Sequence, residues 1–213
     1  MNPSIFKSYD IRGLSPGELD ETAARRIGKA LGQMCKPKHV VVGHDMRATS
    51  NALEEALIDG LLSSGTTVTQ IGLCSTPMFN FAIGEAGGAY DLGVMVTASH
   101  NPASYNGFKI TRGDNLPIGS GSGMEELRDI AISDEPILDS AKQGALTQDD
   151  DVLERYVARV LELAGLPKKL PSWRIAMDAG NGMDGYVLPK LTKRLIRALT
   201  NILAQSTQGV WVQ

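Results

Sequence analysis

Residues 92–111 read LGVMVTASHNPASYNGFKIT, and this stretch decides the fold class. An apolar run predicts a buried strand at 92–97, and a second short strand is predicted at 108–111, after a polar loop of small residues. In open α/β sheets, binding sites lie beyond the carboxyl ends of the strands. We therefore expect the loop that contains Ser99 to be a functional site.

Strands and helices alternate outward from this loop. Short β-branched runs predict strands at 40–42 and 67–71. Helical periodicity and capping signals predict helices at 18–34, 51–63, 76–85, 124–131 and 151–164, with Asn51 and Glu54 as a cap-like start to the second. Residues 1–14 look irregular, and 133–150 look like a polar surface excursion. The alternation predicts an α/β fold, with a mixed, mostly parallel sheet flanked by helices.

The segment PKKLPSW at 167–173 is the best candidate for a linker, because it combines two prolines with two lysines. We expect a first domain at 1–166, a linker at 167–172 and the start of a second, similar domain at 173–213. This second part is predicted to open with a strand at 174–179 and a helix at 187–204.

Composition narrows the class of function. The 213 residues carry a net charge of −3, with 42% hydrophobic and 21% charged residues. This is ordinary for a globular protein and gives no basic surplus for nucleic acid or a membrane surface, so the expected partner is a small molecule. No apolar run is long enough to span a bilayer and no signal peptide is visible, so we expect a cytoplasmic protein.

Three residues have the chemistry of a phosphate-carrying site. Ser99 offers a hydroxyl, and Arg12 and Lys109 offer positive charge, with Lys109 ten residues beyond the serine. The alternatives stay open at this point. Ser99 and His100 fit plain turn residues, and His100 also fits a packed histidine. Lys109 fits a solvated lysine on an edge strand, and Arg12 a structural salt bridge.

Three stretches together resemble the first domain of the phosphohexomutases, the phosphoglucomutase/phosphomannomutase family. They are SYDIRG at 8–13, GHDMRATS at 43–50 and GVMVTASHNPASYNGFKI at 93–110. The combination of TASHNP with NGFK is specific to that family, and the resemblance extends over roughly residues 4–190.

The resemblance implies a role for each matching residue. Ser99 would carry the phosphoryl group, Lys109 would act as general acid or base, and Arg12 would hold phosphate. Tyr9 belongs to the same active-site element as Arg12, while His100 and Asn101 flank the serine. The aspartate, arginine and serine of the second stretch, Asp45, Arg47 and Ser50, would be scaffold that positions the site.

The family moves a phosphoryl group between the 1- and 6-hydroxyls of a hexose phosphate, through a phosphoserine and a bisphosphorylated sugar that turns around in the site. The implied partners are therefore hexose phosphate and hexose bisphosphate. A phosphoserine carries about −1.5 to −2 charge at pH 7, so Mg²⁺ is the expected cofactor, bound at Ser99 through its phosphate. The preferred hexose and the oligomeric state stay open.

One family feature is missing from the sequence. Most Mg²⁺ ligands of the family come from a DGDGDR-type loop in the second of four domains, and no Asp or Glu follows Asp184 here. We therefore expect a truncated chain with little or no activity alone. The alternative is a non-catalytic remnant that binds a phosphorylated ligand. An apolar stripe in the last helix, left uncovered, predicts self-association; it comprises Leu188, Leu191, Leu195, Leu199 and Ile202.

Other readings of the motifs are weaker. Residues 180–185 fit GxGxxG, but the acidic residue that a dinucleotide site needs about 20 positions later is absent. A serine hydrolase would need a GxSxG elbow, which TASHN does not provide. The cysteines and histidines lack the spacing of metal ligands. We predict that Cys35 and Cys74 are reduced, partly buried thiols.

Overall fold

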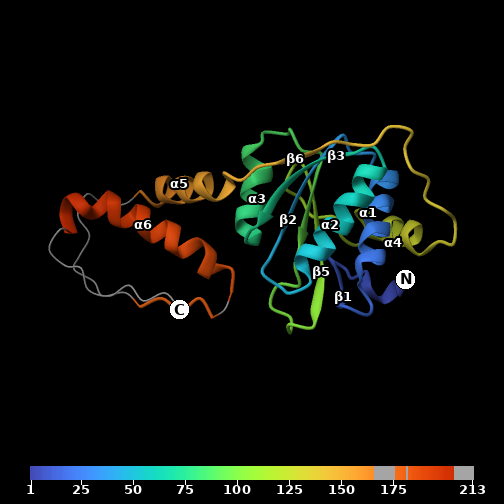
Figure 1. The fold of residues 1–213 in the computed structure, drawn as a ribbon, viewed down its shortest axis with the longest axis horizontal. Coiled ribbons are helices and arrows are strands. Elements are labelled where there is room, and N and C mark those ends of the chain that lie inside the picture. Colours follow the sequence, from blue (N-terminus) through green and yellow to red (C-terminus); the bar gives the residue numbers. More distant parts are fainter. Residues whose placement is uncertain (166–175, 181, 204–213) are drawn as a thin grey trace. The chain divides into compact units, whose positions relative to one another are not determined.

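The computed structural model describes residues 1–165, 176–180 and 182–203 (Figure 1). The chain divides into two compact units, residues 1–150 and 151–213. The first contains the sheet and the serine loop, and the second contains two helices. The boundary predicted near 166 and the linker predicted at 167–172 lie outside the described residues.

A six-stranded sheet forms the centre of the first unit, in the order β1-β5-β4-β2-β3-β6. The strands are β1 (Ile11–Leu14), β2 (His39–His44), β3 (Thr67–Leu73), β4 (Leu92–Val96), β5 (Tyr105–Arg112) and β6 (Leu146–Gln148). β2 pairs in parallel with β3 and β4, and β6 pairs in parallel with β3, whereas β5 runs antiparallel to both β1 and β4. The predicted mixed, mostly parallel sheet is confirmed.

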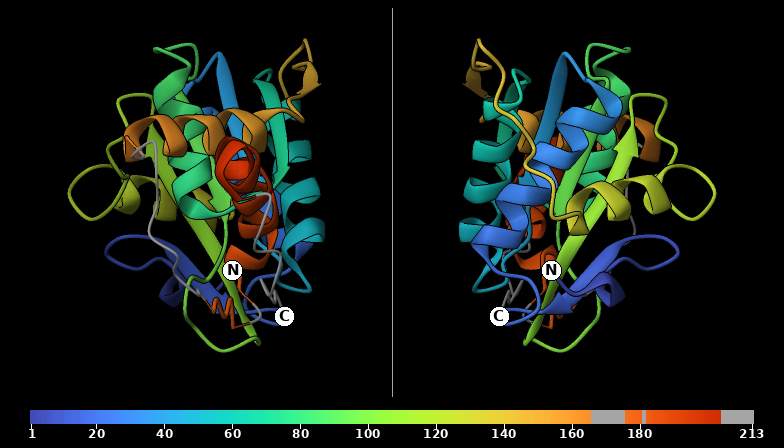
Figure 2. Two further views of the ribbon diagram at one scale, coloured as in Figure 1. Left: turned by 90° about the vertical axis from the view of Figure 1, so that its left-hand side faces the viewer. Right: turned by 90° about the vertical axis from the view of Figure 1, so that its right-hand side faces the viewer.

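Helices cover both faces of this sheet. They are α1 (Glu21–Cys35), α2 (Ser50–Ser63), α3 (Thr76–Glu85) and α4 (Met124–Ile132), preceded by a short 3-10 helix η1 (Pro3–Ile5). Figures 1 and 2 show α1 and α2 on one face and α3 on the other. Neighbouring residues of β4 face these two layers. A Cβ atom built on Gly93 would point at Ile83 and Phe79 of α3, whereas Val94 belongs to the core beneath α1 and α2.

The core between α1, α2 and the sheet depends on close helix packing. Apolar side chains of both helices and of β2 are fully buried there, among them Ile27, Leu57 and Val40. A Cβ at Gly28 would lie 2.3 Å from the carbonyl oxygen of Leu57, so only glycine allows α1 to approach α2 this closely. Burial of each of these aliphatic side chains stabilises the fold by about 1.5–3 kcal/mol. This core therefore stabilises the sheet that supports the site.

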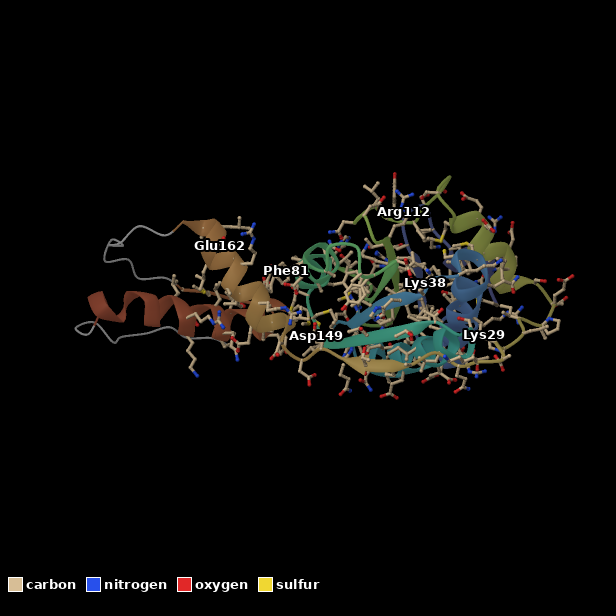
Figure 3. The ribbon with its side chains drawn as sticks, turned by 90° about the horizontal axis from the view of Figure 1, so that it is seen from above. Lys29, Lys38, Phe81, Arg112, Asp149 and Glu162 are labelled. Atoms are coloured by element: carbon tan, nitrogen blue, oxygen red, sulfur yellow. The ribbon has the colours of Figure 1, made fainter. Side chains whose placement is uncertain are left out.

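Two strands and one cap differ from the sequence predictions. β1 lies within residues predicted to be irregular, and β6 lies within the predicted surface excursion. The predicted cap at Asn51 is wrong: Thr49 occupies the N-cap position of α2 and the side chain of Asn51 donates to Glu55. The rest of the segment 133–150 contacts α1, because Lys29 of α1 (Figure 3) donates to the carbonyl of Ile137 at 3.1 Å.

The second unit contains α5 (Val152–Ala164) and α6 (Asp184–Leu203). Glu154 of α5 pairs with both Lys190 and Arg194 of α6. Residues 176–179 of the predicted strand at 174–179 are not in a strand. A strand needs a partner for its backbone hydrogen bonds, and the described residues of this unit provide none. No helix in the described residues is both long and apolar enough to cross a bilayer.

Candidate active site

Residues 97–104, which we call the serine loop, leave the carboxyl end of β4. Ala98 is fully buried and anchors the loop, whereas Ser99 is exposed. The φ of Ser99 is 56°, a left-handed conformation that costs a non-glycine residue about 1–2 kcal/mol. Such strain persists only where the surroundings hold it, and it concentrates at functional sites. The fold thus holds an exposed hydroxyl in a fixed backbone conformation.

Asp45, directly after β2, is the centre of the network that holds this conformation. Its buried carboxylate accepts hydrogen bonds from the hydroxyls of Ser50 and Thr97, each at 2.6 Å. It also accepts the backbone N–H of Arg47 at 3.0 Å. The Thr97 hydroxyl oxygen in turn accepts the backbone N–H of Ser99 at 2.9 Å. Two hydrogen bonds therefore connect a buried charge to the backbone of the serine.

Arg47 holds the serine loop from the other side. Its guanidinium donates to four backbone carbonyls, those of Ser99, Asn101, Pro102 and Tyr105, at 2.8, 2.7, 2.8 and 3.0 Å. The Arg47 side chain is only 9% exposed, and its Nε lies 3.3 Å from the carboxylate of Asp45. A planar fork of donors suits several fixed acceptors, so the predicted scaffold role of Asp45, Arg47 and Ser50 has a physical basis.

Two cations reach the site from the antiparallel strands. Arg12 of β1 faces Gly107 of β5, two residues before Lys109, so the side chains of Arg12 and Lys109 leave the same face of the sheet. Arg12 Nη1 donates to Asn101 Oδ1 of the serine loop at 2.9 Å. The structure therefore places Arg12 against the serine loop through Asn101, with Lys109 on the same face of the sheet as Arg12.

Asp10 joins the two cations, and sequence reasoning missed it. Its Oδ2 accepts from Arg12 Nη2 and lies 3.2 Å from Lys109 Nζ. Arg12 does form a salt bridge, as the structural alternative held, but one that faces the serine loop. Lys109 lies on an interior strand with its side chain 31% exposed. The signal for Asp10 was its position two residues before Arg12 within SYDIRG.

Two predicted site residues are less closely held. His100 is exposed rather than packed, and its Nδ1 lies 3.5 Å from Ser99 Oγ, at the outer limit for a hydrogen bond. Tyr9 is 77% exposed. It lines a cavity of about 260 Å³ next to Lys109, together with residues of α3, β4 and β5. Both side chains stand in solvent at the edge of the site, where a ligand can reach them.

A second buried acidic side chain lies near the network. Glu54 of α2 is fully buried, and its Oε2 accepts from His44 Nδ1 at 3.0 Å and Gln70 Nε2 at 2.6 Å. Burial raises the pKa of the nearby Cys74 thiol well above its usual range, and the carboxylates of Glu54 and Asp45 raise it further. Cys74 is therefore a neutral core thiol, as the sequence indicated, and not a nucleophile.

The described residues do not fit a Mg²⁺ site by themselves. Among them, no three His, Cys, Asp or Glu side chains come together as metal ligands. The carboxylate of Asp45 is buried and already accepts three hydrogen bonds, and that of Asp10 already pairs with two cations. A hard cation such as Mg²⁺ would need oxygen ligands beyond these two.

The fold and the site define a class, that of α/β domains with an exposed serine in a loop after a strand and an arginine that contacts this loop. A family model described as "Phosphoglucomutase/phosphomannomutase, alpha/beta/alpha domain I" matches residues 3–135. This match covers more than half of the chain, so the chain belongs to the phosphoglucomutase/phosphomannomutase family, as the sequence motifs predicted.

Known relatives agree with this assignment. The chain is 40% identical over 196 residues to a phosphomannomutase of Escherichia coli, covering 92% of this chain and 42% of the relative. It is 42% identical over 200 residues to a protein named phosphohexose mutases from Xanthomonas campestris, with the same coverage. A crystal structure of a family protein from Burkholderia thailandensis superposes with a TM-score of 0.74 at 34% identity, covering 92% of this chain and 43% of that one.

The chain thus spans about 42% of the length of the curated relatives it matches. It contains the region that carries the serine loop. The relatives' names belong to an isomerase family that transfers phosphoryl groups, and this is the class of enzyme to which the chain is related.

Proposed function

We propose that Ser99 is the phosphoryl carrier of a phosphohexomutase that interconverts hexose 1-phosphate and hexose 6-phosphate. The observation that carries this proposal is the exposed Ser99 hydroxyl, held in a left-handed conformation by Asp45 and Arg47 in a loop that Arg12 contacts through Asn101. Phosphoryl transfer depends mainly on positioning and charge neutralisation, and this site supplies both for one phosphoryl group.

In the proposed step, a sugar hydroxyl oxygen forms a bond to phosphorus while the bond from phosphorus to Ser99 Oγ breaks. The proton of the sugar hydroxyl passes to solvent water, and Lys109 gives a proton to Ser99 Oγ. Arg12 holds the phosphoryl oxygens through charge-assisted hydrogen bonds. The bisphosphorylated sugar then turns and returns its other phosphoryl group to Ser99 by the reverse step.

The proposed roles of the remaining residues follow their positions. His100 and Tyr9, which stand in solvent, contact the sugar phosphate, and Asn101 keeps Arg12 at the serine loop. A Mg²⁺ ion would bind an oxygen of the phosphoserine together with ligands from outside the described residues. We propose that the reaction takes place in the cytoplasm, and the enzyme must share a compartment with its substrate, because charged sugar phosphates do not cross an apolar bilayer unaided.

A domain exchange tests this proposal. Residues 1–150 replace the corresponding region of the Escherichia coli phosphomannomutase, and the chimera is assayed with hexose 1-phosphate and mapped for phosphate by mass spectrometry. We expect phosphate on Ser99 and mutase turnover, both lost in Ser99→Ala and kept in the control Ser104→Ala, which alters another serine of the same loop. Phosphate that persists in the Ser99→Ala chimera, within residues 1–150, would remove Ser99 from the role.

A further inference from the structure

Asp10 stands at the centre of the cation pair, although the proposed transfer assigns it no step. Asp10 is 8% exposed, and its carboxylate Oδ2 contacts both Arg12 and Lys109. Its backbone is fixed as well, since its carbonyl accepts the N–H of Lys7 at 2.8 Å. The carboxylate therefore has a defined position just before β1.

The two cations depend on Asp10 to different degrees. Arg12 has a second partner, because it also donates to Asn101. For Lys109, the contact with Asp10 is the hydrogen bond that the structure describes, at 3.2 Å. A lysine ammonium lies at the end of a flexible four-carbon side chain, so its position depends on the fixed group to which it is hydrogen-bonded.

Charge balance supports the same view. Arg12 and Lys109 bring two positive charges close together, and like charges repel. The carboxylate of Asp10 lies between them and leaves the group with a single net positive charge. That surplus still attracts a phosphoryl group, while the repulsion that would drive Lys109 away from Arg12 is neutralised.

We propose that Asp10 is the positioning residue for Lys109, holding its ammonium on the same sheet face as Arg12, the arginine that contacts the serine loop. This deepens the proposed function, and it rests on that function for the use made of the lysine. Asp10 acts through Lys109 and Arg12, and it does not contact the transferred group itself.

Ammonium proton exchange in the 213-residue chain reports this contact directly. In protein labelled with ¹⁵N-lysine, the Lys109 signal is assigned by its loss in Lys109→Arg. We expect its protons to exchange with water more slowly than those of Lys38, whose side chain is exposed (Figure 3). Asp10→Asn should speed the exchange about tenfold or more, because a hydrogen bond between charged groups contributes about 1.5–3 kcal/mol.

A matched variant controls for a general effect of removing a carboxylate. Asp114→Asn breaks an exposed pair with Arg112, at the end of the strand that carries Lys109. It should leave the exchange of Lys109 unchanged. Equal exchange in Asp10→Asn and wild type would overturn the proposal. Should Asp10→Asn fail to fold, the wild type decides: a Lys109 signal that exchanges as fast as Lys38 overturns it as well.

The chimera gives a second readout that a merely structural role would not move. There, Asp10→Asn should lower kcat with little change in KM, and Asp10→Glu should restore part of the loss. The two proposals fail separately. Loss of the serine role appears as phosphate outside Ser99, whereas loss of the Asp10 role appears as unchanged proton exchange at Lys109, which requires no phosphate.

Discussion

Ser99 combines two properties that oppose each other. Its backbone adopts a conformation that glycine accepts at no steric cost, yet a glycine would have no hydroxyl. The Asp45 network and the four hydrogen bonds of Arg47 provide the energy that keeps a serine in this conformation. The strained backbone of Ser99 therefore lowers the stability of the loop, and the same backbone conformation fixes the position of the hydroxyl.

Two variants of Ser99 separate the backbone from the hydroxyl. Both Ser99→Gly and Ser99→Ala remove the hydroxyl, but only glycine relieves the positive φ. We expect the glycine variant to be more stable than the alanine variant by about 1 kcal/mol, measured by urea unfolding. The reverse order would mean that the left-handed conformation carries no strain.

Arg47→Lys tests the hydrogen-bond scaffold. A lysine ammonium cannot span four carbonyls that a planar fork reaches at once, so we expect the free energy of unfolding to fall by about 2 kcal/mol. Amide exchange at residues 99–105 should accelerate. Arg112→Lys, at an arginine that is 44% exposed, is the matched control and should change stability by less than about 0.5 kcal/mol. Equal effects of the two substitutions would contradict the scaffold role.

At this scale the sequence indicated candidate site residues, but not how they are held. Ser99, Arg12 and Lys109 belong to motifs that can be recognised in the amino-acid sequence alone. The role of Asp10 depends on a contact between residues 99 positions apart, and no local pattern reports such a contact. The burial of Glu54 was hidden for the same reason, since its partners come from two strands.

Among the elements, those with strong apolar periodicity were the predictable ones. β2 and β4 are mostly buried runs, β3 is partly buried, and α1 has a clear apolar face. β1 was missed because four residues with a glycine carry little pattern, and β6 because it has only three residues and all are exposed. Both are edge strands, which form only because a neighbouring strand pairs with them.

In the second unit, ion pairing links the two helices, so Glu154→Gln should loosen α6. Lys190 and, to a lesser degree, Arg194 hold the pKa of Glu154 below its usual value. A depressed pKa in the folded state means that the contact stabilises above the ordinary value of 4.5 and is lost as the pH falls below it. We expect faster amide exchange at residues 184–195 in the variant.

High salt should shrink this difference, because screening weakens exposed pairs. Glu162→Gln is the matched control in the same helix, since Glu162 (Figure 3) pairs with Arg159 of its own helix. Equal exchange in α6 for both variants would show that the Glu154 pairs do not hold the helices together.

For the whole molecule, we expect no measurable mutase turnover by the purified 213-residue chain. Turnover requires the sugar to be held in line with Ser99, and effective positioning supplies much of the rate. We propose that this grip comes from parts of the relatives that lie outside the 42% this chain spans. The assay follows conversion of hexose 1-phosphate, with the Escherichia coli relative as positive control. Turnover that disappears in Ser99→Ala would contradict the expectation.

The pairing of β1 with β5 has a consequence for biosynthesis. Ile11 leaves the ribosome early but faces Phe108 in the finished sheet, so the N-terminal segment waits unpaired while α1 to β4 emerge. Because such distant contacts form slowly, we expect the pairing that delivers Arg12 to the sheet face of Lys109 to come late in folding. A nascent chain halted before β5 would expose an unpaired β1 to chaperones, and it would not yet contain Ser99 with both of its neighbouring cations.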